Sequence, residues 1–470
     1  MAEPDVPNAA GPHPAPPAPE GDGAVTSALT EAVREAIRTG DSERLRALVG
    51  DLHEADQGEL LQALEAELRP GLIELLGDDF HFAALTEVDE SVRLEVLETL
   101  PTEIVVEGLR ELESDDAVYI LEDLPHSEQQ LILELLPLPE RAALTRSLDF
   151  PEESAGRRMQ TDFIAVPPFW TVGRTVDYLR EIKDAPETFY EVYVIDPGFK
   201  LLGTVALNKL LRAPREARLE SVLDDEVREI EGTEDQEEAG RVFQRYNLVS
   251  APVVDDSGRL VGVLTIDDIV DVINQEADED IKALAGVFGD EELSDKVVQT
   301  ARSRFPWLLM NLGTAGIAAS VIGFFEGTIE QMVALAILMP IVASMGGNAG
   351  TQAMTVTVRA IAMREIGARN MRRMVTREVL VGAVNGVSLA IVLGIGAGLF
   401  FRNPQLGAVI ATALIVNMIV AGFFGTLIPL TVNRLKLDPA VASAVFVTTV
   451  TDVVGFFSFL GLSAWWFGLW

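Results

Sequence analysis

The stretch PIVASMGGNAGTQAMT, residues 340–355, contains no charged side chain and lies within a long apolar run of the chain. Because about 20 apolar residues cross about 30 Å of hydrocarbon as a helix, this run predicts a membrane-spanning segment. Four further runs have the same character. The five predicted spans are residues 305–325, 331–357, 379–401, 407–432 and 441–468.

Charge divides the chain near the first span. Residues 301–470 hold 6 acidic and 11 basic side chains, a net charge of +5, whereas residues 1–300 hold 67 and 25, a net charge of −42. The apolar half excludes a wholly soluble protein. Such an acidic half is repelled by the phosphates of a nucleic acid, so its natural partners are cations.

The basic residues predict the orientation of the spans, because cytoplasmic loops carry an excess of lysine and arginine. Residues 359–377 include six arginines, and shorter basic segments flank the first span and follow the fourth. With five spans, all of these fall on one side. We therefore expect a multi-pass protein of the plasma (inner) membrane with a cytoplasmic N-terminus and its C-terminus outside.

Few polar side chains occur within the spans. Asp452, in VTTVTDVVGFF (447–457), is the one ionisable residue deep in the fifth span, and such residues are costly and usually functional. A structural hydrogen bond to a neighbouring helix is the alternative. Glycines in 346–350 are also expected to permit close helix packing. Candidate pore-lining residues are Asn348, Gln352, Asn417, Thr448 and Thr451.

The ligand types available point to a hard cation. The chain has no cysteine, and all four histidines precede residue 130, so the spans lack the ligands that softer metals prefer. Oxygen ligands suit Mg²⁺, which gives up its water reluctantly. One Asp452 per chain, doubled by a two-fold axis, suits a hydrated divalent ion. No nucleophile–base pair or catalytic metal motif indicates an enzyme.

The acidic half begins with two different segments. Residues 1–24 are rich in proline, alanine and glycine, without the pattern of a signal peptide, and predict a disordered tail. Residues 25–155 have helical periodicity, with Leu-Pro pairs at 100–101, 124–125 and 136–137. Because proline disfavours helix in the preceding residue, each pair is expected to end a short helix. This predicts an all-α acidic helical-repeat domain.

An internal repeat follows, with an offset of 59 residues. Residues 193–211 align without gaps on 252–270, and each copy is typical of strand, turn, strand and helix. The repeat resembles a tandem α/β pair of CBS motifs, with the first at 156–217 and the second at 218–275. The resemblance implies that ATP or another adenosine nucleotide binds Thr265 and Asp268 of the second copy. The first copy has Ala206 and Lys209 there, and Thr265 could instead cap the following helix.

A polar segment, residues 276–304, connects the repeat to a transmembrane domain at 305–470. This order, with PIVASMGGNAGTQ and TTVTDVVGFF, resembles the MgtE family of magnesium channels over nearly the whole chain beyond residue 25. The resemblance implies a homodimer with its pore at the membrane interface, where Asp452 holds Mg²⁺ through its waters. It also implies that cytoplasmic Mg²⁺ closes the pore and that the connecting helices act as plugs.

The same resemblance implies a set of cytoplasmic Mg²⁺-sensing carboxylates. They are Asp235, Glu237, Asp268, Asp271, Glu276, Glu279, Asp280 and Asp438. Two positions depart from the family pattern, at Asn247 and Ala444. The charge of the acidic half supports a sensor independently, because divalent cations between two such faces would relieve their repulsion. For most of the 67 carboxylates a solvated surface is the better interpretation.

These observations favour a Mg²⁺-selective channel for uptake, with Mg²⁺ as substrate and regulator and the lipid bilayer and a second copy as partners. One alternative is a broader carrier for Co²⁺ or Mn²⁺, or an exchanger coupled to another cation. Another is a membrane-anchored nucleotide sensor. Binding of nucleic acid is not expected.

Overall fold

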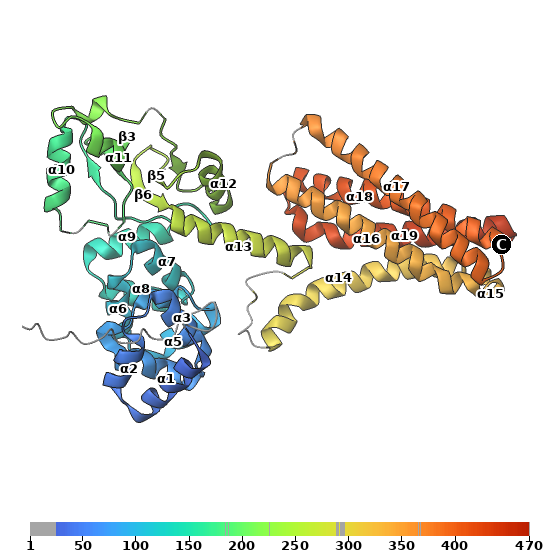
Figure 1. Ribbon diagram of the computed structural model, residues 1–470, viewed down its shortest axis with the longest axis horizontal. Coiled ribbons are helices and arrows are strands. Elements are labelled where there is room, and N and C mark those ends of the chain that lie inside the picture. Colours follow the sequence, from blue (N-terminus) through green and yellow to red (C-terminus); the bar gives the residue numbers. More distant parts are fainter. Residues whose placement is uncertain are drawn as a thin grey trace, which may run out of the picture. The chain divides into compact units, whose positions relative to one another are not determined.

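The computed structural model describes residues 25–183, 185–186, 188–224, 226–287, 291, 297–364, 366 and 368–469. The chain divides into two compact units, Met1–Ile273 and Asn274–Trp470 (Figure 1). The predicted tail at 1–24 lies outside the described residues, as does part of the predicted connecting segment. The predicted domain boundaries therefore stay predictions.

The first unit begins with short helices that pack around one leucine-rich core. Proline is the residue immediately before α6, α8 and α9, and the leucine of a Leu-Pro pair is the C-cap residue that follows α5 and α8. The expectation that Leu-Pro pairs separate short helices is thus confirmed. The helices are α1 (Ser27–Thr39), α2 (Ser42–Val49), α3 (Glu54–Ala63), α4 (Arg69–Leu76), α5 (Glu90–Thr99), α6 (Thr102–Glu111), α7 (Ser114–Glu122), α8 (His126–Leu135) and α9 (Leu138–Leu148).

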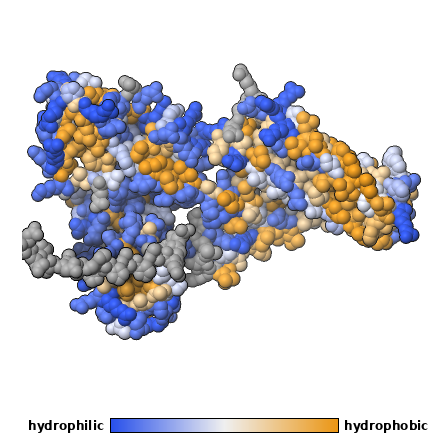
Figure 2. Space-filling model, in the orientation of Figure 1, coloured by the Kyte–Doolittle hydropathy of each residue, from blue (hydrophilic) through white to orange (hydrophobic). Residues whose placement is uncertain are grey.

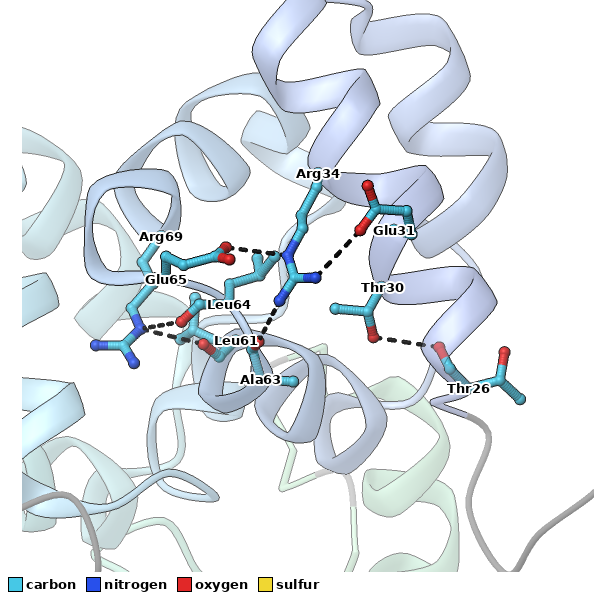
Figure 3. A network of polar contacts seen from close by, with 9 residues as sticks. All are labelled: Thr26, Thr30, Glu31, Arg34, Leu61, Ala63, Leu64, Glu65 and Arg69. Carbon is cyan, nitrogen blue, oxygen red and sulfur yellow. Dashed lines mark hydrogen bonds and ion pairs between the residues drawn. The ribbon is translucent and has the colours of Figure 1, made fainter.

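Two arginines from neighbouring segments satisfy the carbonyl groups at the end of α3 (Figure 3). Arg69 Nε donates to the Leu61 and Leu64 carbonyls at 3.2 and 3.1 Å, and Arg34 Nη2 donates to the Ala63 carbonyl at 3.4 Å. The last carbonyls of a helix have no intrahelical partner. These arginines therefore take the place of a glycine cap and join α1, α3 and α4.

Two small three-stranded sheets follow. In each, a short parallel strand precedes an antiparallel pair, in the order β1-β2-β3 and β4-β5-β6. The strands are β1 (Ala165–Val166), β2 (Glu191–Ile195), β3 (Leu201–Ala206), β4 (Ile230–Glu231), β5 (Ser250–Val254) and β6 (Leu260–Thr265). The helices are α10 (Val172–Glu181), α11 (Leu207–Arg212), α12 (Gln236–Tyr246) and α13 (Ile266–Leu284).

The two sheets confirm the repeat at an offset of 59 residues. Glu191 pairs with Ala206 in the first sheet, as Ser250 pairs with Thr265 in the second. The turns of the two copies also meet, because Leu201 N donates to the Gly258 carbonyl at 3.1 Å. The arrangement fits the predicted CBS pair.

Within the described part of the second unit, five helices are long and apolar enough to cross a membrane, which confirms the predicted number of spans. Hydrophobic surface covers much of this unit in Figure 2. The α18 helix packs against α16, α17 and α19 and contributes many buried residues. The helices are α14 (Val297–Phe324), α15 (Glu326–Gln331), α16 (Ala334–Ala362), α17 (Ala368–Phe400), α18 (Pro404–Arg434) and α19 (Pro439–Phe467).

Several helices extend beyond the predicted spans. The third span was expected from residue 379, but α17 begins at Ala368. The first was expected from residue 305, but α14 begins at Val297, within the predicted connecting segment. Hydropathy marks the part of a helix that lies in hydrocarbon, whereas the helix itself continues into the polar interface.

Candidate functional site

Asp452 lies on α19, the helix of the fifth span, and is partly buried in the single chain. Among the described residues no basic side chain comes within 4.0 Å of it. Thr448, one turn earlier on the same face, is exposed, and its hydroxyl donates to the Ala444 carbonyl at 2.9 Å. The fifth span therefore presents a carboxylate and a hydroxyl group at or near the surface of the single chain.

Glycines allow α16 to lie very close to its neighbours. A Cβ added to Gly350 would lie 2.6 Å from Val447 Cγ1, and one added to Gly346 would lie 2.1 Å from Asn417 Nδ2. The packing role expected for these glycines is therefore present. Asn348 and Gln352, on the same helix, are exposed. Two of the predicted pore-lining residues thus reach the surface of α16.

Asn417 is fully buried, which distinguishes it from the exposed candidates. Its Nδ2 donates to the Val342 carbonyl at 2.9 Å, and its Oδ1 has no hydrogen-bond partner among the described residues. A Cβ on Gly455 of α19 would lie 2.8 Å from the same Nδ2. Asn417 therefore joins α18 to α16 and touches α19. Thr451 is also fully buried, and its hydroxyl donates to the Thr448 carbonyl at 2.9 Å.

A second group of carboxylates lies in the first unit, where the beginnings of α7 and α13 meet. Asp115 is buried beside Asp268, and its Oδ1 has no hydrogen-bond partner among the described residues. Burial and the charge of Asp268 raise the pKa of Asp115 well above its usual range. For the same two reasons the pKa of Asp116 rises to about 7. Burial raises the pKa of Asp268 to about 6.

The backbone before the first sheet holds α7 in this position. Gln160 and Val263 exchange backbone hydrogen bonds of 2.8 and 2.9 Å, which places residue 160 beside β6. Thr161 N then donates to Ser114 Oγ at 2.7 Å, at the first residue of α7. Because α13 follows β6 directly, the first turns of the two helices are brought together.

The two α7 carboxylates were not among the predicted sensor residues. The sequence around them, ESDDA (113–117), resembles three other acidic pairs in the first 150 residues, at 78–79, 89–90 and 122–123. Their one distinguishing signal is their place in the first turn of a helix that the Leu-Pro pairs delimit.

The other predicted sensor residues lie at the starts of α12 and α19 or along α13. Asp235 caps α12, where its Oδ1 accepts a hydrogen bond from Glu237 N at 2.9 Å, and Glu237 pairs with Arg241. Asp438 caps α19 in the same way, with Ala440 N at 2.8 Å. Asp271 is largely exposed, and partial desolvation together with the negative charge of Asp267 raises its pKa. Later turns of α13 carry Glu276, Glu279 and Asp280.

Within the described ranges, no three acidic or histidine side chains are already arranged as a metal centre. The α7–α13 carboxylates are therefore electrostatically coupled without forming a complete coordination shell.

The nucleotide half-site differs between the two copies. Thr265 Oγ1 donates to Asp268 Oδ2 at 2.5 Å, so the pair expected to hold a ribose is assembled in the second copy. In the first copy, Lys209 Nζ donates to the Leu223 carbonyl at 2.7 Å and pairs with Asp224 at 3.0 Å. The first copy thus has a cation where the second has a carboxylate.

The second unit has five spans and a surface that bears a carboxylate, and the same chain carries an acidic helical domain and a CBS pair. These features define an integral membrane protein suited to transporting a hard cation. Comparison with known families supports each part. The profile of MgtE, a divalent cation transporter, matches residues 339–462, the MgtE intracellular N domain matches 52–153, and the CBS domain matches 219–275.

The full-length relatives agree. The magnesium transporter MgtE of Bacillus subtilis is 34% identical over 314 residues, which cover 66% of this chain and 69% of the relative. That of Thermus thermophilus is 33% identical over 315 residues, with the same coverage. The chain therefore belongs to the MgtE family of magnesium transporters. It is a transporter of Mg²⁺ with an intracellular N domain, and it is not an enzyme.

Two solved structures each match about half of the chain. The cytosolic domain of the Mg²⁺ channel MgtE in complex with ATP is 30% identical, covers 52% of this chain and 99% of its own, and has a TM-score of 0.49. The soluble part of a magnesium transporter is 26% identical, covers 53% of this chain and 98% of its own, and has a TM-score of 0.46.

Proposed function

We propose that the chain forms a Mg²⁺-selective channel for uptake, which closes when cytoplasmic Mg²⁺ binds its acidic domains. The observation that carries the regulatory part is the carboxylate group of Asp115, Asp116 and Asp268. It lies where the helical domain meets the second CBS motif, so its charge bears directly on the contact between those two domains.

The residues present fit Mg²⁺ as a regulator. Mg²⁺ takes carboxylate and water oxygens, and Asp115 Oδ1 is a buried oxygen without a partner in the described chain. Near neutral pH these closely spaced carboxyl groups must either hold protons or repel one another. A divalent cation removes that repulsion only while the two helices are together. It therefore shifts the equilibrium towards the compact arrangement, because it binds that arrangement more tightly.

More carboxylates surround the same contact. Burial and the charge of Asp271 raise the pKa of Glu87, which places acidic groups of the helical domain and of α13 within electrostatic range of each other. Further Mg²⁺ ions would bind the acidic turns beyond this contact, closing the connecting helices over the pore. The candidate ligands there are Asp235, Glu237, Asp271, Glu276, Glu279, Asp280 and Asp438.

The surface of the membrane unit supports a homodimer with the pore between two copies. Asp452, Thr448, Asn348 and Gln352 lie at or near the surface of one protomer. Exposure of a carboxylate to lipid is expensive, and such groups normally face a water-filled cavity or another helix. A second copy supplies that cavity, and two Asp452 carboxylates then hold a hydrated Mg²⁺ on the axis. The C-terminus lies outside the plasma (inner) membrane.

An adenosine nucleotide would bind the second CBS copy through Thr265 and Asp268. The cytosolic domain of the related Mg²⁺ channel was solved with ATP. Because Asp268 is also part of the α7–α13 carboxylate group, nucleotide and Mg²⁺ would act on the same turn of α13.

Patch recording from the full-length protein, with cytoplasmic Mg²⁺ varied from near zero to millimolar, tests the proposal. We expect Mg²⁺ currents that decrease as cytoplasmic Mg²⁺ rises. In an Asp268→Asn variant the currents should already be reduced without cytoplasmic Mg²⁺ and should respond less when it is added. Asp452→Asn should lose selectivity for Mg²⁺ over Co²⁺ and Mn²⁺. Currents independent of cytoplasmic Mg²⁺ would remove the sensor. Flux without channel currents would favour the broader carrier or exchanger.

A further inference from the structure

The cytoplasmic end of α17 forms an open hollow of about 770 Å³ on the surface of the membrane unit. Three guanidinium groups line one end of it, from Arg372, Arg373 and Arg377. Its other end is apolar and is lined by Leu380, Val381 and Val384. These three apolar side chains are 59%, 43% and 65% exposed, so no other part of the described chain covers them.

Among the described residues, carboxylates offset little of the positive charge of the hollow. Neither Arg372 nor Arg373 has a carboxylate within 4.0 Å among the described residues. Glu378 approaches Arg377 only at 4.0 Å, and its own side chain is 11% exposed. Its backbone faces α18, because a Cβ on Gly422 would lie 2.5 Å from the Glu378 carbonyl oxygen. The arginines therefore present net positive charge outward.

A further basic group lies close to this end of α17. Arg434, at the end of α18, donates from Nη2 to Met371 Sδ at 3.3 Å. This contact holds a fourth guanidinium group beside the first turns of α17. An anion in the hollow would therefore meet positive charge from two helices.

The order of charge and apolar surface along the helix matches a lipid molecule. Arg377 precedes Val384 by seven residues, which is about 10 Å along a helix. One leaflet of the hydrocarbon layer is about 15 Å thick. After Glu378, α17 carries no charged residue up to Phe400. The arginines thus lie at the level of the phosphate groups, and the apolar wall begins directly below them.

We propose that this hollow binds an anionic phospholipid of the cytoplasmic leaflet. The arginines hold its phosphate group, and the face formed by Leu380, Val381 and Val384 packs against the upper part of an acyl chain. The excess of arginine on the cytoplasmic side follows from the orientation of the spans. That rule does not require three arginines to converge above an exposed apolar wall, whereas a bound phospholipid does.

The test measures lipid retained by the full-length protein in detergent, using native mass spectrometry with phosphatidylglycerol and phosphatidylcholine. We expect preferential retention of phosphatidylglycerol. An arginine near the membrane surface contributes about fivefold in affinity for anionic lipid, so replacing Arg372, Arg373 and Arg377 by glutamine should weaken binding on the order of 100-fold. Arg377→Gln alone should weaken it about fivefold. Both changes are at exposed positions.

Arg402→Gln is the matched control, because Arg402 follows the opposite end of α17 and lies outside the hollow. It should leave retention of phosphatidylglycerol unchanged. Excess inorganic phosphate should not displace the lipid, since phosphate makes no contact with the apolar wall. Equal retention by the triple variant and the unmodified protein would overturn the proposal. So would complete displacement by inorganic phosphate, which would indicate a site for a free anion.

Discussion

Replacing Asp268 by asparagine should stabilise the contact between α7 and α13 when Mg²⁺ is absent. The change keeps the shape of the side chain, and the amide oxygen can still accept the hydrogen bond from Thr265. Burial raises the pKa of Asp268 from its usual 3.8 to about 6. At about 1.36 kcal/mol per unit, the ionised form costs up to about 3 kcal/mol at about pH 8. Asparagine removes that cost.

Hydrogen exchange of the full-length protein, followed by mass spectrometry, measures this contact directly. Peptides that cover the first turns of α7 should exchange up to about 100-fold more slowly in Asp268→Asn without Mg²⁺, because about 1.4 kcal/mol corresponds to a factor of ten. In the unmodified protein, Mg²⁺ should produce a similar slowing. In the variant, added Mg²⁺ should change the rate little.

Asp256→Asn is the matched control, because Asp256 is an exposed carboxylate in the turn between β5 and β6 and is not among the groups that act on Asp115, Asp116 or Asp268. It should leave both the Mg²⁺-free rate and the response to Mg²⁺ nearly unchanged. The reasoning fails if Asp268→Asn exchanges as fast as the unmodified protein without Mg²⁺. It also fails if Mg²⁺ slows exchange equally in the two proteins.

The same contact should respond to pH with a definite sign. Because the pKa values of Asp116 and Asp268 are raised to about 7 and about 6, the native form binds more protons than the unfolded chain between about pH 4 and pH 7. The contact therefore gains stability as pH falls through this range. The effect of Mg²⁺ should be large near pH 8 and small near pH 5, after correction for intrinsic exchange rates. A response to Mg²⁺ that grows on acidification would contradict this. Other titratable groups facing the cluster are Glu54, Glu87, Glu113, Asp115, Asp267 and Asp271.

Two further predictions concern packing. Gly346→Ala should lower the melting temperature in detergent, at a cost of about 1–3 kcal/mol, because its Cβ would lie 2.1 Å from Asn417 Nδ2. The control Gly347→Ala should not lower it, because no atom lies within 4 Å of the Cβ that it adds. Arg93→Met should destabilise the first unit by about 3–5 kcal/mol in thermal unfolding, because it leaves Asp123, now 2.7 Å from Arg93 Nε, without its buried partner. An unchanged melting temperature in Gly346→Ala or Arg93→Met would refute the corresponding prediction.

The parts of the fold that the sequence predicts are those fixed by local patterns. Each strand–turn–strand copy has the same alternation of side chains, so the offset of 59 residues is visible in the amino-acid sequence itself. The turns of the two copies confirm this offset. Asp196 and Asp255 each accept backbone hydrogen bonds from residues two and four positions later. A Leu-Pro pair likewise determines only where the adjacent helix ends, within a few residues of the pair.

The parts that the sequence does not predict depend on long-range packing. Asp115 and Asp268 are far apart in the chain, and nothing near either residue specifies the other. A polar residue in a span presents a similar difficulty. Hydropathy identifies Asn417 as unusual, but it does not indicate whether the side chain faces a pore or the interior of the bundle. In the single chain, the hydrogen bond from Asn417 to the Val342 carbonyl shows that this side chain faces the interior of the bundle.

Burial, more than the total charge, makes the α7–α13 carboxylates suitable for sensing a cation. The N-terminus of a helix favours negative charge, and Asp115, Asp116 and Asp268 all lie in first turns. Their pKa values are nevertheless raised, so desolvation outweighs the two helix dipoles once the helices meet. When the helices separate, water and the dipoles again stabilise the ionised groups. In the proposed closing of this contact, the free energy therefore depends on neutralising these few oxygens.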